Sequence, residues 1–281
     1  MGKVKIKRKS TLIDMTAMSD VTVLLLTFFM LTSTFLQKEP TIVYTPSSIS
    51  EEKVPVKDLV TILVSSADKS GRLDDPTVTE GKIFLSFAGD SILPSEQLRS
   101  EILQKAITVY NTDGAGQRKG HELSLTAQQI DAFAKTNMMG TPFRYLPEVL
   151  DMDIVRRDQL MGDLDGSKFP ELANRIGIPI NNNIKDNNLN DFQVWMKALK
   201  LVAQDIRVKK LETEGLDPAN PDDIEKIRAL DMLYNTLMQG QSISIKADKD
   251  TPFSVINQIF ENLRFMELNK FTLMTALKSN S

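Results

Sequence analysis

LIDMTAMSDVTVLLLTFFMLTSTFL, the stretch from Leu12 to Leu36, decides how the rest of the chain is organised. Between Met15 and Leu36, Asp20 is the one charged residue. An α-helix rises about 1.5 Å per residue, so this run measures roughly 33 Å and covers a hydrocarbon core of about 30 Å. We therefore expect residues 12–36 to form a transmembrane helix that contains Asp20.

Asp20 needs a physical reason to lie in such a helix. A charged side chain near the middle of a bilayer costs about 2.5 to 3.5 kcal/mol on insertion scales, so carboxylates there generally face protein or water. Removal from water favours the neutral form of a carboxyl group, and a group that exchanges between both forms can carry a proton. In the alternative, Asp20 lies at the interface and only the run from Val21 to Leu36 is left to form the span. That run is short for a membrane helix.

Three threonines share a helical stripe with Asp20. Thr27 and Thr34 follow it at heptad spacing, and Thr16 precedes it by one turn. Thr16 is the strongest supporting candidate, because a side chain one turn away can orient the carboxylate. The alternative for the threonines is a hydrogen bond to a carbonyl of their own helix, which adjusts packing only slightly.

The charges on either side of the helix predict its orientation. By the positive-inside rule, a basic tail stays in the cytoplasm and the acidic remainder of the chain is exported. A cleaved signal peptide is disfavoured, because the apolar run is longer than that of most signal peptides and no small-x-small cleavage site follows. Topology and anionic lipid explain the basic tail without nucleic acid. Residues 1–11 contain no acidic residue and five basic ones, Lys3, Lys5, Lys7, Arg8 and Lys9.

Residues 37–57 are rich in Pro, Ser and Glu, which predicts an extended linker. Within it, residues 41–46 have the composition of a short strand. Residues 58–110 then show two strand patterns, at 59–64 and 82–87. After Pro94, apolar residues recur at helical spacing up to Tyr110 and predict an amphipathic helix.

Residues 241–281 supply a matching second half of this exported domain. Residues 242–247 alternate as a strand, a helix is expected to start between Asp248 and Pro252, and residues 271–275 close as a strand. The chain has no cysteine, so no disulfide holds the domain together and its core must do so.

Between these halves lies the long segment 111–240, which we expect to be a mostly helical insertion. Thr126 and Gln129 have the spacing of a capping box at a helix start. A longer helix is expected at 190–214, and another from Asp222 onward. The apolar stripes of these helices are more typical of a core than of a binding surface, and we expect an antiparallel hairpin or a small bundle.

Chemistry of other kinds finds little support in the sequence. A single histidine, His121, and the absence of cysteine argue against zinc sites and against Ser-His or Cys-His catalysis. No phosphate-binding glycine motif is present. Asp163 and Asp165 beside Gly166 are similar to a calcium loop, but too few ligand positions match, so a turn is expected. We predict no enzyme activity, no cofactor and no metal.

The motif Ile13-Asp14-Met15-Thr16-Ala17-Met18-Ser19-Asp20-Val21, with the run from Leu24 to Met30, resembles the signature of the ExbD/TolR family of bacterial inner-membrane proteins. Thr16 and Asp20 stand at the family's Thr and Asp positions. Two departures are Ala17, where many members have Pro, and the polar Thr27. The resemblance implies a single amino-terminal transmembrane helix plus an exported α+β domain of ExbD/TolR type, split by a long, mostly helical insertion.

The resemblance also implies a function. Asp20 would be the proton-carrying residue of an inner-membrane motor, with Thr16, Thr27 and Thr34 supporting the proton path. The partners would be an ExbB-like polytopic membrane protein, a TonB-like energy transducer and a second copy of the chain, with the carboxyl-terminal domain in the periplasm. One alternative is a TolR-like subunit acting in envelope integrity. Another is a signal-anchored periplasmic scaffold without ion transport.

Overall fold

The computed structural model describes residues 15–32, 45, 47–48, 59–65, 82–89, 94–115, 120–164, 166–180, 188–217, 219–228, 230–231, 242–249, 251–274 and 276–277. The chain divides into two compact units, Met1–Lys38 and Glu39–Ser281.

In the described part of the first unit, the helix α1 spans Met15–Thr32. The large apolar side chains described in it are all between 48% and 64% exposed. The outer parts of the predicted span, 12–14 and 33–36, lie outside the described residues. In the described part of the chain, no helix is both long enough and apolar enough to cross a membrane.

The second unit is built on a four-stranded sheet with the order β3-β2-β4-β5. Its strands are β2 (Leu59–Ser65), β3 (Lys82–Ala88), β4 (Ile243–Ala247) and β5 (Thr272–Met274). β2 is antiparallel to β3 and parallel to β4, and β4 is parallel to β5. The strands predicted on both sides of the middle region, residues 111–240, therefore form one sheet.

The register aligns buried side chains across the sheet. Ile62 of β2 lies opposite Leu85 of β3 and Ile245 of β4, and all three are buried. Side chains directly opposite each other share a face, so this row forms a continuous apolar surface. Burial of that surface is the main force that holds helices against the sheet.

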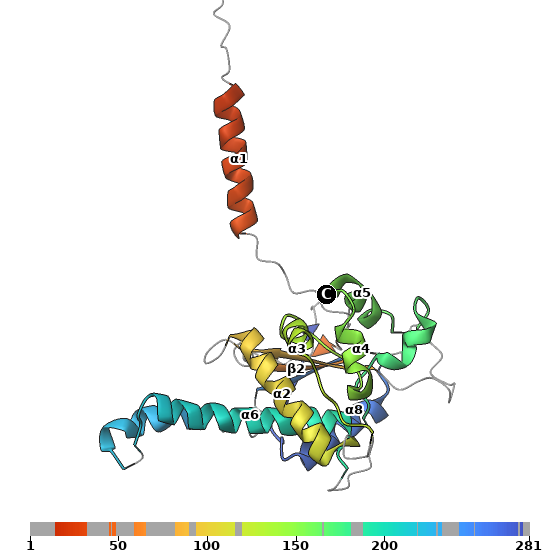
Figure 1. Cartoon of the computed structure of the whole chain (residues 1–281), viewed down its shortest axis with the longest axis vertical. Coiled ribbons are helices and arrows are strands. Elements are labelled where there is room, and N and C mark those ends of the chain that lie inside the picture. The colour runs from red at the N-terminus through yellow and green to blue at the C-terminus, as the bar shows by residue number, and fades with distance from the viewer. Residues whose placement is uncertain are drawn as a thin grey trace, which may run out of the picture. The chain divides into compact units, whose positions relative to one another are not determined.

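Three helices pack together beside the sheet: α2 (Ser95–Asp113), α6 (Asp191–Thr213) and α8 (Phe253–Phe265) (Figure 1). α2 begins after Pro94, as predicted, and buries an apolar stripe that includes Ile102 and Ala106. α8 begins after Pro252 and buries Val255, Ile259 and Leu263. The elements predicted at 94–110 and from 252 onward are confirmed.

The predicted stripe on α6 belongs to the core. Trp195 stacks on Phe143 and Phe133, with ring centroids 4.8 and 5.5 Å away, and lies 5.9 Å from Phe87 of β3. Aromatic contacts of this kind add to the free energy gained from apolar burial. The fully or nearly fully buried side chains of the stripe are Phe192, Trp195, Met196, Leu199, Val202, Ala203 and Ile206.

α6 of the middle region also takes part in the main core, beyond the hairpin or bundle expected from the sequence. Arg207 of α6 pairs with Asp231 of the next helical segment at 2.6 Å, and the remainder of that segment lies outside the described residues. α6 packs mainly along α2, and its buried side chains join the same hydrophobic core as those of the sheet and α8. An apolar stripe shows which face of a helix is buried but not what buries it, and here the partner is α2. Figure 1 shows the carboxyl-terminal end of α6 extending past the other helices.

Short elements fill the rest of the middle region. Thr126 and Gln129 form the predicted capping box at the start of α3. The helix predicted from Asp222 starts as a 3₁₀ turn, capped by Asn220, and continues through residues 224–228 and 230–231, with the remainder outside the described residues. The short elements are α3 (Ala127–Ala134), η2 (Phe143–Tyr145), α4 (Leu146–Leu150), α5 (Ile154–Met161), η3 (Pro170–Arg175) and η4 (Pro221–Asp223).

Two segments of the middle region cover the outer edge of β3. The backbones of Met139 and Leu85 exchange two hydrogen bonds, of 2.8 and 2.9 Å, and the Ile178 N–H donates to the Ile83 carbonyl at 2.9 Å. A free strand edge offers unpaired backbone groups to other chains, so this cover protects the sheet from edge-to-edge association.

The linker pairs with the end of the chain. β1 (Ser47–Ser48) runs parallel to β6 (Ala276–Leu277), with Ser47 opposite Ala276. The strand predicted at 41–46 lies outside the described residues except for Thr45, and the observed pairing begins just after it.

Gly140 provides a test of how tightly the middle region fits on β3. A Cβ atom at this position would lie 2.2 Å from Cδ1 of Phe84 and 2.8 Å from the Ile83 carbonyl oxygen. Because backbone cannot yield as a flexible side chain does, we expect Gly140→Ala to lower the free energy of unfolding by about 1–3 kcal/mol. Gly162 is exposed with φ −82°, so Gly162→Ala is the matched control and should change stability by less than about 0.5 kcal/mol. Urea unfolding of both variants measures this, and equal stabilities would contradict the close fit.

Candidate functional site

The helical backbone of α1 arranges the predicted proton-path residues as their spacing suggested. Thr16 lies one turn before Asp20, and Thr27 lies about two turns after it. Asp20 is exposed within the helix. Thr34 lies outside the described residues, so its place on the stripe stays a prediction.

The Thr27 hydroxyl donates to the Leu24 carbonyl at 2.9 Å. This is the own-helix hydrogen bond named above as the alternative for the threonines. A hydroxyl that donates this way still has lone pairs to accept another hydrogen bond. Thr22, which the sequence did not single out, makes the same type of bond to the Met18 carbonyl.

The surface around Asp20 is apolar on several sides. A helix that is hydrophobic all round is buried in a protein core or in a membrane, whereas a surface helix has one apolar face. The helix therefore presents a carboxylate among exposed apolar side chains. A single helix cannot enclose an ion path. The exposed large apolar residues of α1 are Met18, Val21, Val23, Leu24, Leu25, Leu26, Phe28 and Phe29.

In the second unit, two buried arginines hold the end of α3. The Arg99 Nη1 donates to the Ala134 carbonyl at 2.9 Å, and its Nε donates to the Phe87 carbonyl of β3. The Arg157 Nη1 donates to the Ala132 carbonyl at 3.2 Å. Burial lowers the pKa of both guanidinium groups, which nevertheless remain charged because arginine's pKa is so high. Cations at a helix carboxyl terminus complement its dipole and its unpaired carbonyls.

The start of α6 carries a polar network that the sequence analysis missed. Asn190 and Gln193 exchange side-chain to backbone hydrogen bonds as a capping box, at 2.8 and 3.0 Å. Both side chains also donate to the Asn262 side-chain carbonyl oxygen of α8. Gln193 and Asn262 are fully buried. The Asn-x-x-Gln spacing before an apolar stripe was the signal for this cap.

Asp191 lies within this network and binds another part of the middle region. Its Oδ2 accepts a 2.8 Å hydrogen bond from the Phe143 backbone N–H at the start of η2. Burial raises the pKa of Asp191 from its ordinary 3.8 to about 6, and the hydrogen bond from Phe143 opposes that rise. Asp191 therefore titrates in a range where most carboxylates are fully ionised.

Of the residues considered for metal binding, Asp163 takes a structural role, and Asp165 lies outside the described residues. Asp163 is buried and accepts hydrogen bonds from the backbone N–H groups of Lys168 and Phe169, which makes the predicted turn. His121 is exposed. No group of three or more His, Cys, Asp or Glu side chains suited to a metal ion occurs among the residues for which the structure gives positions.

Comparison with known proteins gives one family match. Residues 7–132 match the family described as biopolymer transport protein ExbD/TolR. The matched range contains α1, the linker, β2, β3, α2 and most of α3. No curated protein and no solved structure matches the chain significantly.

Asp191 makes a pH-dependent contribution to stability whose sign follows from its pKa. Because the folded state holds the proton more tightly than the unfolded state, the free energy of unfolding falls as the pH rises from about 4 to 6. Asp191→Asn keeps an oxygen that can accept from Phe143 and cannot ionise. We expect this variant to lose that pH dependence and to be more stable at pH 7 by up to about 3 kcal/mol.

Urea unfolding of the full chain between pH 4.5 and 7.5 measures both effects. Asp131→Asn is the matched control, because Asp131 is exposed and pairs with Lys135 at 2.7 Å. That variant should keep the wild-type dependence on pH. An unchanged pH dependence in Asp191→Asn would show that ionisation of Asp191 in the folded state costs little free energy, which would contradict the prediction.

Proposed function

This chain belongs to the ExbD/TolR family, and from that premise we propose that it is the proton-carrying subunit of an inner-membrane motor that energises TonB-dependent outer-membrane transport. The observation that carries the proposal is the carboxylate of Asp20 on the otherwise uncharged helix α1, one turn after Thr16. Members of a family of transport subunits act by moving ions and partner proteins, so we propose no enzyme activity and no cofactor.

In the proposed topology, residues 12–36 cross the inner membrane, with residues 1–11 in the cytoplasm and the second unit in the periplasm. Five positive charges without an acidic residue support the cytoplasmic tail. The exposed apolar side chains of α1 support burial of this segment in lipid or against partner helices, since their own unit leaves them uncovered.

Asp20 is the proposed proton carrier. Protonation removes a charge that is costly in the bilayer, and loss of the proton restores it, so the two states prefer different surroundings. A proton that crosses the membrane potential supplies about 2.3 kcal/mol per 100 mV, plus the contribution of the pH gradient. Thr16 is the proposed neighbour that orients the carboxylate, and Thr27 and Thr34 are further candidates along the same stripe.

Asp20 alone does not make a path, because a single helix encloses no ion. Partner helices must provide the walls and the access from each side. We propose that an ExbB-like polytopic protein encloses α1, that two copies of this chain work together, and that a TonB-like transducer receives the motion. The second unit transmits the motion, and residues 37–57 act as a tether between it and the membrane.

A TolR-like role in envelope integrity is the second candidate, because the matching family description names ExbD and TolR together. Both candidates use the same carboxylate and the same membrane helix. They differ in the outer-membrane process that depends on the motor.

Asp20→Asn tests the motor itself. Asn keeps the size and hydrogen bonding of Asp but cannot ionise, so we expect normal assembly and an at least tenfold loss of energised uptake, measured by accumulation of a labelled TonB-dependent substrate in cells. Asp14→Asn is the matched control, since Asp14 lies nearer the basic tail and should retain uptake. Full uptake in Asp20→Asn cells at normal protein abundance would refute the motor and favour the scaffold.

Two measurements on cells lacking this chain separate the candidates. The TonB-linked role predicts lost uptake with normal resistance to detergents. The TolR-like role predicts detergent sensitivity and leakage of periplasmic protein with normal uptake. Restoration by the wild-type chain, and not by Asp20→Asn, assigns the defect to the motor.

A further inference from the structure

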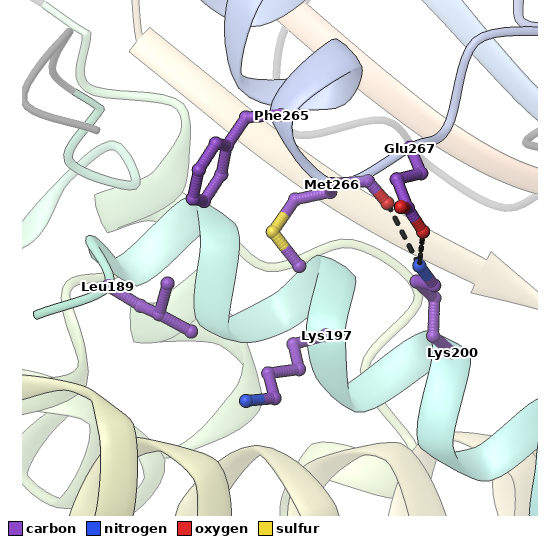
Figure 2. Close-up of a pocket in the computed structure, with 6 residues that line it drawn as sticks. All are labelled: Leu189, Lys197, Lys200, Phe265, Met266 and Glu267. Carbon is purple, nitrogen blue, oxygen red and sulfur yellow. Dashed lines mark hydrogen bonds and ion pairs between the residues drawn. The ribbon is translucent and has the colours of Figure 1, made fainter. Parts of the chain in front are cut away.

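A cavity of about 310 Å³ lies between α6 and the end of α8. α6 comes from the middle region and α8 from the carboxyl-terminal part, so two distant segments of the chain build it. Its volume lies at the lower end of the range of about 300–1,000 Å³ that is typical of small-molecule sites. The residues that line it are Leu189, Lys197, Lys200, Phe265, Met266 and Glu267 (Figure 2).

Lys200 supplies a fixed positive charge at one side of this cavity. Its Nζ donates to the Met266 carbonyl oxygen at 3.1 Å and to the Glu267 carboxylate at 3.2 Å (Figure 2). The side chain of Lys200 is only 19% exposed, whereas that of Glu267 is 83% exposed. An exposed carboxylate gains little from such a pair. Glu267 can therefore be replaced by another carboxylate while the Met266 carbonyl keeps the ammonium group in place.

The rest of the cavity wall is largely apolar. Leu189 and Met266 are buried, and Phe265 is half-buried. In Figure 2 the ammonium group of Lys197 points away from that of Lys200. The Lys197 Nζ is paired with Asp113 at 2.9 Å, so Lys200 is the cation whose anion can be exchanged.

We propose that this cavity binds an organic acid that joins a carboxylate to a small apolar or aromatic body. The carboxylate takes the place of Glu267 on Lys200, and the apolar body lies against Leu189, Phe265 and Met266. The same chemistry is offered by a free aromatic or aliphatic acid and by the carboxyl end of a peptide with an apolar last residue. This site is independent of the proton path and of the motor function proposed above.

Binding is measured on the full chain with ¹³C-methyl methionine, using the Met266 methyl resonance assigned by its loss in Met266→Leu. The two probes are 4-phenylbutyrate and N-acetyl-leucyl-phenylalanine, and their amides are the neutral controls. For ligands of this size we expect saturation with Kd on the order of 1 mM. The amides should give no saturable shift, because they lack the charge that pairs with Lys200.

Variants at the two ion-pair positions should change the affinity in opposite directions. Lys200→Met should weaken binding of the acids at least tenfold, and Lys200→Arg should retain it. Glu267→Gln removes the competing carboxylate and should tighten binding two- to fivefold. Lys209→Met is the matched control on α6, because Lys209 pairs with Glu101 and does not line this cavity.

Each outcome decides the proposal. Tighter binding of 4-phenylbutyrate indicates a free acid, and tighter binding of the peptide indicates a chain terminus. Equal affinity for acids and amides, no saturable shift with either acid, or an unchanged Kd in Lys200→Met would overturn it. If Lys200→Met does not fold, Glu267→Gln still decides, since it leaves Lys200 and the end of α8 intact. Unchanged or weaker binding of the acids by Glu267→Gln would refute competition between Glu267 and the ligand carboxylate for Lys200.

Discussion

The parallel pairing of β2 with β4 is the constraint on which the second unit depends. Five aligned residue pairs, from Val60 opposite Ile243 to Val64 opposite Ala247, join strands that the whole middle region separates. Two parallel neighbours cannot be joined by a tight turn, so the connecting chain must cross over a face of the sheet. Here the connection contains β3, α2 and α6. The middle region is therefore part of the crossover that makes the sheet possible.

This constraint explains why α6 lies in the core. Trp195 stacks on Phe133 and Phe143, and its helix packs along α2, which itself covers the sheet. Removing residues 111–240 would expose the apolar surfaces of both α2 and β3 and leave the β3 edge without its cover. Loss of function in such a deletion would report loss of folding. The role of the middle region is accessible only through substitutions that spare its buried stripe.

The sequence predicted what is local and periodic. The Thr126–Gln129 capping box is a local pair at a helix start, and the apolar run of β2 and the stripe of α6 follow the pattern of their element. The structure confirms all three. It did not predict that Met139 pairs with Leu85 or that Arg99 and Arg157 bind the last carbonyls of α3, because backbone partners far along the chain leave no periodic signal. For the candidate site, spacing gave Asp20 and Thr16, while Asp191 was missed because an acidic residue in a first helical turn is ordinary.

The linker limits how a motor at Asp20 would act on the second unit. A force from the membrane side reaches β1, which lies within residues 37–57, before it reaches β2. Among the described residues, two pairs hold β1 to β6. β2 is held by five pairs to β4 and by seven to β3, and its side chains are in the core. Segments with few backbone bonds open at lower free energy than core strands. A pull from the membrane would therefore separate the described β1–β6 pairs before the pairs that hold β2 in the sheet.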